Sequence, residues 1–294
     1  MHFFIKGERI IMEYKIKPFE ELDVIDDYMA NAAASDPVVG KAFSRALVEG
    51  LLQKKLGEHI RVNVQRSMLG DTPEKRGIRM DIEIAEYDEH MLHAMPINIY
   101  DIEPHKRKNI DIVKHNRFYQ AKIDSQGLKS GEKDFVNLPN LFVIMITNYD
   151  PFGYDYMLYT VRNRCDEVPD LEYEDGLQFL YFNTTGRLGG NEALKWFLSY
   201  IQNSTQMNVR DSATRQLHEC ISLVKESPEA RMSYMMWEEK IFYERRDAKE
   251  EGRIEERLRV IKKKLEKNKT VEQIAEDLEI TVEEAKEYVR MLLE

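Results

Sequence analysis

The sequence predicts a mixed α/β protein, in which a sheet is flanked by helices and followed by a region that is helical throughout. Three observations favour this fold class. Several short segments alternate polar and apolar residues, as half-buried strands do. The run at residues 141–147 is almost continuously apolar, which is typical of a central strand covered on both faces. After residue 183 the strand pattern ends, and only helical periodicity remains.

Each element has a local pattern of its own. Helical periodicity begins at residue 19 and runs to 55, with Asp36 and Pro37 as a cap and first turn because proline is tolerated at a helix start. The other expected helices are residues 109–126, 192–201, 213–225, 234–267, 271–278 and 282–293. The expected strands are residues 62–65, 78–86, 97–103, 141–147, 157–161 and 177–182.

Shifts in composition divide the chain into four segments. These are an N-terminal extension (1–35), a core (36–205), a helical region with a long charged arm (206–269) and a small helix-turn-helix-like unit (270–294). The last helix begins with the acidic pair Glu283 and Glu284, and like charge disfavours its entry into a DNA groove. We therefore expect the C-terminal helices to pack against a partner and to form a homo-oligomer.

The bulk composition excludes several classes of protein. No apolar run approaches the roughly 18 residues that span a bilayer, and the opening apolar stretch is too short for a secretory signal. The two cysteines, Cys165 and Cys220, are too few for a disulfide framework or a four-cysteine zinc site, which predicts a cytoplasmic protein with reduced thiols. The net charge of −10 argues against coating nucleic acid, although a local basic groove remains compatible with DNA as substrate.

Two acids stand inside predicted strands. Asp81 lies within Arg79-Met80-Asp81-Ile82, and Glu103 lies within Tyr100-Asp101-Ile102-Glu103. Among apolar neighbours a carboxylate is costly unless a cation lies against it. If these strands pair so that the two side chains share a face, they can bind Mg²⁺ or Mn²⁺, which prefer oxygen ligands. The alternative is that both strands simply have ordinary polar faces.

The neighbours of these acids add to the pattern. Period-2 alternation places Asp81 on one face with Glu83, and Glu103 on one face with Asp101 and His105. A basic stretch at residues 105–108 follows immediately. Paired acids beside basic residues favour metal-dependent phosphodiester chemistry, because the cation stabilises negative charge on the phosphate.

An acid on one strand, followed by Glu-x-polar on the next, resembles the PD-(D/E)xK nuclease superfamily. More narrowly, the chain resembles the recombination-promoting nuclease, or transposase, family, over most of its length from Asp36. The segments that carry the likeness are Arg79-Met80-Asp81-Ile82, Tyr100-Asp101-Ile102-Glu103, Arg117-Phe118-Tyr119-Gln120, Asp150-Pro151-Phe152-Gly153 and Tyr159-Thr160-Val161-Arg162. The resemblance implies a restriction-endonuclease-like sheet and an Mg²⁺-dependent DNA endonuclease linked to recombination, mobile elements and phage defence.

The resemblance also implies roles for the acids. Asp81 becomes the central metal ligand and Glu103 the second acid. Glu49 matches the acid that the first helix often adds, although a helix end at Gly50 could instead expose it to solvent. His105 takes the place of the superfamily lysine, and imidazole is not a permanent cation at neutral pH.

For substrate binding, the resemblance points to the helix after the second acidic strand. Arg117 and Gln120 lie three residues apart on one side of it and would contact phosphate; a merely polar helix surface is the alternative. Lys106 can supply the missing positive charge, but alternation directs it to the other face of the strand.

A second functional class stays open. The chain can be a catalytically silent relative that acts as an oligomeric binding or regulatory module. His105 in the lysine position, the acidic net charge and the acidic terminal helix all favour this alternative.

Overall fold

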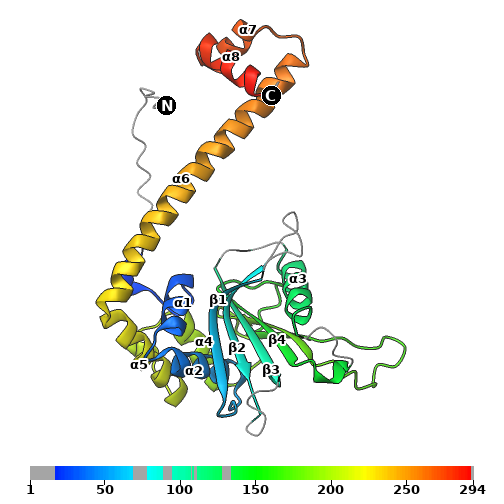
Figure 1. The fold of residues 1–294 in the computed structure, drawn as a ribbon, viewed down its shortest axis with the longest axis vertical. Helices are drawn as coiled ribbons and strands as arrows, with labels where there is room; N and C mark the ends of the chain where they lie inside the picture. Colours follow the sequence, from blue (N-terminus) through cyan, green and yellow to red (C-terminus); the bar gives the residue numbers. More distant parts are fainter. Residues whose placement is uncertain are drawn as a thin grey trace. The chain divides into compact units, whose positions relative to one another are not determined.

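A computed structural model describes residues 17–68, 78–88, 95–106, 108, 111–127 and 134–292 (Figure 1). The chain forms two compact units, Met1–Arg231 and Met232–Glu294. This division differs from the boundaries at residues 205 and 269 that composition suggested, because the helix at residues 212–226 packs against the helix at residues 40–52 of the first unit. The first unit is mixed α/β, and the second is helical.

The first unit is built on one six-stranded mixed sheet in the order β1-β2-β3-β4-β6-β5. Pairing is antiparallel from β1 to β3, parallel across β3, β4 and β6, and antiparallel again between β5 and β6. The strands are β1 (Ile60–Met68), β2 (Ile78–Glu86), β3 (Asn98–His105), β4 (Asn140–Thr147), β5 (Leu158–Val161) and β6 (Leu177–Asn183). The predicted mixed α/β class is confirmed, and β4 is the buried central strand that its apolar run predicts.

Helices cover both faces of the sheet. In Figure 1, α1, α2, α4 and α5 lie on one side and α3 on the other. The helices and helical turns of this unit are η1 (Phe19–Glu21), α1 (Asp27–Ser35), α2 (Gly40–Leu52), α3 (Ile112–Asp124), η2 (Phe135–Asn137), α4 (Glu192–Gln202), η3 (Gln206–Asn208) and α5 (Ser212–Glu226).

The helical pattern is interrupted between α1 and α2, at the Asp36 cap that the sequence predicts. The Asp36 carboxylate accepts hydrogen bonds from the backbone N–H groups of Val38 and Val39, at 2.8 and 2.9 Å. Small buried residues such as Ala30 and Ala33 let α1 lie close to the sheet. Residues 27–35 are therefore an integral part of the first unit.

On the α3 side, the sheet carries an apolar cluster that fixes the position of that helix. Met80 of β2, Ile99 of β3 and Val143 of β4 pack with Ile123 of α3. The cluster anchors one end of α3, while Ile112 packs with Met145 and Tyr181 near the other. The helix is thus held across β2, β3 and β4, over the part of the sheet that carries the acids.

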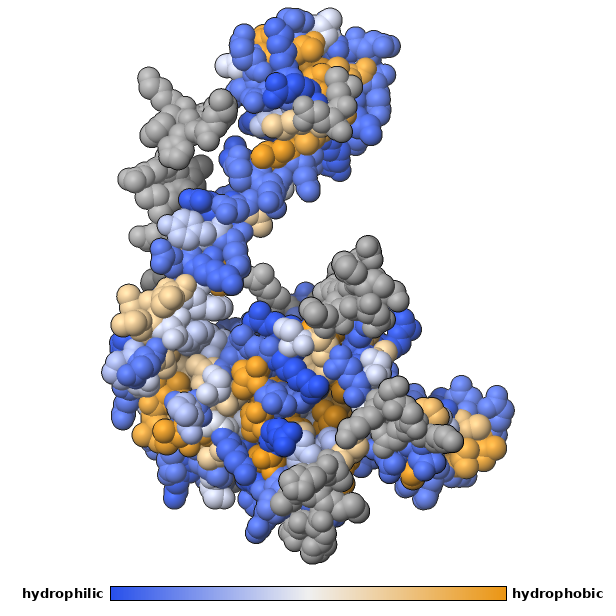
Figure 2. All heavy atoms as spheres, viewed as in Figure 1, coloured by the Kyte–Doolittle hydropathy of each residue, from blue (hydrophilic) through white to orange (hydrophobic). Residues whose placement is uncertain are grey.

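The second unit consists of most of α6 (Pro228–Leu265), which begins in the first unit, together with α7 (Val271–Asp277) and α8 (Val282–Met291). Reciprocal capping boxes start α7 at Thr270 and Gln273, and α8 at Thr281 and Glu284. Ile261, Ile274 and Ala285 are buried. Over the whole molecule, hydrophilic residues dominate the face drawn in Figure 2. None of the described helices is both long and apolar enough to cross a bilayer.

Candidate functional site

Asp81 and Glu103 meet on neighbouring strands. The register of β2 and β3 pairs Ile82 with Ile102 and Glu83 with Asp101, and its continuation sets Asp81 opposite Glu103. The backbone N–H of Asp81 donates to Glu103 Oε1 at 3.1 Å, and the two carboxyl groups also hydrogen-bond. Asp81 and Glu103 are therefore in direct contact.

The contact between the Asp81 N–H and Glu103 forms where the backbone pairing of the sheet is interrupted. The β1–β2 ladder skips the position at which Gln65 faces Asp81, and Gln65 has φ of 52°, in the left-handed region. The β2–β3 ladder also ends at Ile82. The N–H of Asp81 is therefore free of the ladder and donates to a side chain. Irregular strand positions often redirect their groups in this way next to functional sites.

A third acid, Asp101, lies near this pair and lacks hydrogen-bond partners in the part of the chain that the structure describes. Asp101 is fully buried, and neither of its carboxyl oxygens has a hydrogen-bond partner among the described residues. Burial raises the pKa of Asp101, and the charges of Glu83 and Asp81 raise it further. A buried carboxyl without partners is expensive, so this position carries a cost that packing does not explain.

The protonation of the pair follows from its surroundings. Burial raises the pKa of Asp81 to about 6, and the nearby Asp27 adds to this shift. Burial, with the charges of Asp101 and Asp81, raises the pKa of Glu103 well above its usual range. Because Asp81 accepts the hydrogen bond in this arrangement, the shared proton resides on Glu103, whose pKa is raised.

Helix α1 supplies two residues that sequence reasoning missed. Asn31 hydrogen-bonds the Asp81 carboxylate and also donates to the Asp27 carbonyl oxygen at 2.8 Å. Asp27 lies one helical turn before Asn31 and acts on Asp81 electrostatically. The i, i+4 spacing of these two polar residues was the available signal, but nothing local indicated which strand they would face.

The structure does not bring Glu49 to this pair. One oxygen of its carboxylate accepts from Arg45 at 3.3 Å and from the backbone N–H of Leu56 at 3.1 Å, and the other binds Lys55 at 2.6 Å. These contacts fasten the end of α2 to the segment that follows. The helix acid that acts electrostatically on Asp81 is Asp27 on α1.

His105 lies two residues beyond Glu103, near the end of β3. Its Nε2 is buried and has no hydrogen-bond partner in the described part of the chain. Its ring meets that of Tyr149 edge-on, with centroids 6.4 Å apart. Burial lowers the pKa of His105, and the nearby His115 lowers it further, so the ring is neutral at pH 7. The position at which the resemblance led us to expect lysine therefore holds no cation.

The residues expected to bind phosphate have different surroundings. Lys106 forms an ion pair with Asp26, at the start of α1. Gln120 donates to Asp124 within α3. Arg117 is exposed and forms no ion pair with any described residue, so it keeps its charge available to a ligand. Tyr119 of α3 donates to the Arg79 carbonyl oxygen at 3.1 Å. Burial raises the pKa of Tyr119 to about 12, and the charges of Glu103, Asp101 and Asp81 add to the shift.

The carboxylates of this site can be compared with the ligands that a hard divalent cation needs. Within the described ranges, no group of three or more His, Cys, Asp or Glu side chains is arranged to hold a metal ion. Two carboxylates nevertheless meet the needs of Mg²⁺, which usually keeps several waters and takes one or two protein carboxylates together with substrate phosphates. Cation binding would release the proton shared by Asp81 and Glu103 and would offset the buried charge beside Asp101.

Comparison of the chain with family models, curated proteins and solved structures finds no match. The geometry of the acids and the chemistry of the residues around them are therefore what indicates a function.

Proposed function

We propose that the protein is an Mg²⁺- or Mn²⁺-dependent DNA endonuclease with a restriction-endonuclease-like core. The observation that carries the proposal is the hydrogen-bonded carboxyl pair of Asp81 and Glu103 on adjacent strands, with the uncompensated Asp101 buried behind it. Such a group is costly in a structural role, and a divalent cation would compensate it.

In this proposal Asp81 and Glu103 hold the cation. A bound cation supplies positive charge to the scissile phosphate and lowers the pKa of water. Neighbouring groups hold the two ligands in position: Asn31 orients the Asp81 carboxylate, and the Asp81 N–H fixes Glu103. Arg117, on the exposed side of α3, contacts the phosphate backbone. Neutral His105 acts as a positioning residue beside Glu103.

Self-association is the second part of the proposal. The first turns of α6 expose large apolar side chains whose spacings include three, four and seven residues, a pattern that suits helix pairing. They are Met232, Met235, Met236, Trp237, Phe242 and Tyr243. A homo-oligomer formed through these helices would present more than one nuclease core to a DNA duplex. Reduced cysteines are consistent with a cytoplasmic protein.

Plasmid nicking with Mg²⁺ or Mn²⁺ tests the proposal. Glu103→Gln preserves both hydrogen bonds, because its amide can accept from the Asp81 N–H and donate to the Asp81 carboxylate, but it removes a ligand charge. We expect this variant and Asp81→Asn to abolish nicking and to bind Mn²⁺ weakly by calorimetry. Glu49→Gln, with its side chain at the end of α2, is the control and should retain activity. Nicking that survives both site changes would refute the assignment.

The alternative is a catalytically silent, oligomeric regulatory protein. The neutral His105 and the shared proton between Asp81 and Glu103 favour it, since both suit a site that is stable without a cation. Wild-type protein that neither nicks DNA nor binds Mn²⁺ at pH 8, while forming a stable oligomer in sedimentation experiments, would establish this alternative.

A further inference from the structure

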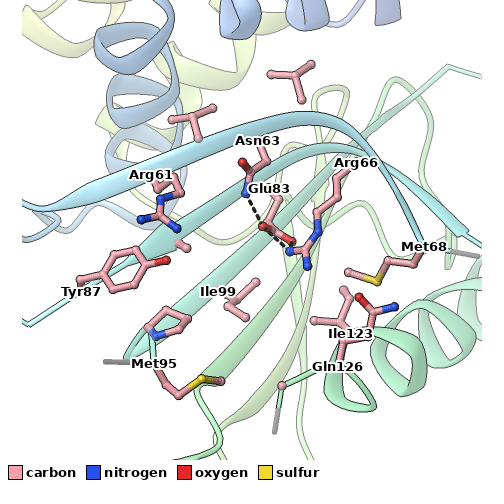
Figure 3. Close-up of a pocket in the computed structure, with 15 residues that line it drawn as sticks. Arg61, Asn63, Arg66, Met68, Glu83, Tyr87, Met95, Ile99, Ile123 and Gln126 are labelled. Atoms are coloured by element: carbon pink, nitrogen blue, oxygen red, sulfur yellow. Dashed lines mark hydrogen bonds and ion pairs between the residues drawn. The ribbon is translucent and has the colours of Figure 1, made fainter. Parts of the chain in front are cut away.

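A cavity of about 730 Å³ opens over β1 and β2, on the side of the sheet that faces α3 (Figure 3). Arg61, Asn63 and Arg66 project into it from β1, and Glu83 projects from β2. Asp81, Asp101 and Glu103 are not part of its lining. The cavity is therefore separate from the carboxyl pair, although Glu83 lies beside both.

The charges in the cavity leave one cation available. Glu83 accepts from Arg66 Nη1 at 2.7 Å and from Asn63 Nδ2 at 2.7 Å, so its charge is compensated. Arg61 has no ion-pair partner in the described part of the chain, and its guanidinium lies 5.3 Å from the centre of the Tyr87 ring. Two arginines against one glutamate make the described lining net positive, on a chain whose net charge is −10.

The rest of the lining is apolar or neutral and polar. Met68, Ile99 and Ile123 form an apolar wall and belong to the buried cluster under α3. Met95 lies at the same end of the cavity as Tyr87 (Figure 3). Gln126 presents an amide at the rim. The volume is typical of small-ligand pockets, which combine apolar walls with a few placed polar groups.

We propose that this cavity binds a nucleotide. Arg61 holds the phosphate, since guanidinium groups recognise phosphate oxygens in a bidentate manner. The base lies against the Tyr87 ring and the side chain of Met95, as bases stack on aromatic platforms. The amide of Gln126 and the amide oxygen of Asn63, whose nitrogen already donates to Glu83, are available to polar base edges. Two sources can provide this group: a free mononucleotide, or the terminal nucleotide of a DNA single strand.

The binding requires no divalent cation, so it can be measured apart from cleavage. Isothermal titration calorimetry of the full chain in EDTA would compare deoxynucleoside monophosphates, the matching nucleosides and inorganic phosphate. We expect the monophosphates to bind about tenfold or more tightly than either fragment, because both halves of the cavity are then occupied. Equal binding of nucleoside and monophosphate, or no binding of any monophosphate to folded protein, would overturn the proposal.

Variants assign the contacts. Arg61→Ala should weaken monophosphate binding about tenfold or more and leave nucleoside binding nearly unchanged. Tyr87→Ala should weaken both by about tenfold. Arg215→Ala, an exposed arginine of α5 outside the cavity, is the matched control and should bind like the wild type. Circular dichroism would verify that each variant is folded. Affinities unchanged in both cavity variants would disprove the assignment.

The two sources are separated by competition. A short 5′-phosphorylated single strand that displaces the mononucleotide, with the same dependence on Arg61, identifies the strand end as the ligand. A strand that fails to displace it identifies the free nucleotide. Loss of plasmid nicking with intact nucleotide binding would refute the endonuclease proposal alone, so the failures of the two proposals can be distinguished.

Discussion

The side-chain amide of Asn31 on α1 hydrogen-bonds the carboxylate of Asp81 on β2. This contact ties a helix on one face of the sheet to the acid that lies at the interruption of β1 and β2. Because the same amide donates to the Asp27 carbonyl at 2.8 Å, its position is fixed from within the helix. Asp81 is thus held from two sides, by Asn31 and by Glu103.

Asn31→Ala should loosen Asp81 and destabilise the first unit. The loss of a buried donor to a carboxylate costs about 1–3 kcal/mol, and the variant should therefore unfold at lower urea concentration. Mn²⁺ binding should weaken in parallel, since the ligand is less well oriented. Asn163→Ala, which removes an exposed hydrogen bond to Asp175, is the control and should leave stability nearly unchanged. Unaltered stability of Asn31→Ala would contradict the role of this amide.

Glu103 makes stability depend on pH with a definite sign. Its folded-state pKa is raised, chiefly by burial, so the native state retains a proton that the unfolded chain releases above pH ~4.3. The stability that this proton provides is complete below that pH and is lost as pH rises toward the folded-state pKa. Asp81 acts in the same direction between about 4 and its raised pKa of about 6.

Glu103→Gln should therefore raise the melting temperature at pH 8 and change it little at pH 4, with EDTA present. Thermal unfolding at several pH values would measure the difference. The matched variant Glu49→Gln should lower stability at pH 8 instead, because Lys55 and Arg45 lower the pKa of Glu49 despite its burial. An equal effect of Glu103→Gln at both pH values would show that the shared proton is absent.

Asp26 is expected to have the opposite pH dependence. Burial opposes its ionisation, but hydrogen bonds from the Asp23 N–H and Lys106 lower its pKa below the usual value. Its contribution to stability is therefore present above pH ~3.9 and is lost as pH falls through the lowered pKa. Asp26→Asn should destabilise the protein at pH 7 and have a smaller effect near pH 2, as measured by urea unfolding. A larger effect in acid would reverse this assignment.

Local patterns predicted much of the fold. Alternation of polar and apolar residues located the strands that carry the acids, and the apolar run identified β4. Both kinds of burial determine the sequence pattern directly. The same alternation grouped Asp81 with Glu83 and Glu103 with Asp101, and left it to the pairing of the strands whether the two acids share a face. The interruption at Gln65, where φ is positive, had no such trace, since glutamine rarely adopts that conformation.

The rest of the site depends on tertiary packing. Asn31 and Lys106 are polar residues whose partners lie far away in sequence, and no local spacing indicates which strand or helix they meet. Glu49 was recoverable in principle, because Arg45 lies four residues before it on the same helix face and Lys55 lies just beyond the helix end. A nearby pair of cations was a simpler partner for that acid than a distant metal site.

Gly50 lets α2 lie directly against α4. A Cβ added at this position would lie 2.1 Å from ring atoms of Phe197, which is fully buried and cannot move aside freely. Gly50→Ala should therefore destabilise the first unit by about 1–3 kcal/mol or more, through overpacking, as measured by urea unfolding. Gly252→Ala is the matched change, since this glycine of α6 has nothing within 4 Å of an added Cβ. There the better helix propensity of alanine should raise stability by about 1 kcal/mol. A neutral Gly50→Ala would show that the two helices are not in close contact.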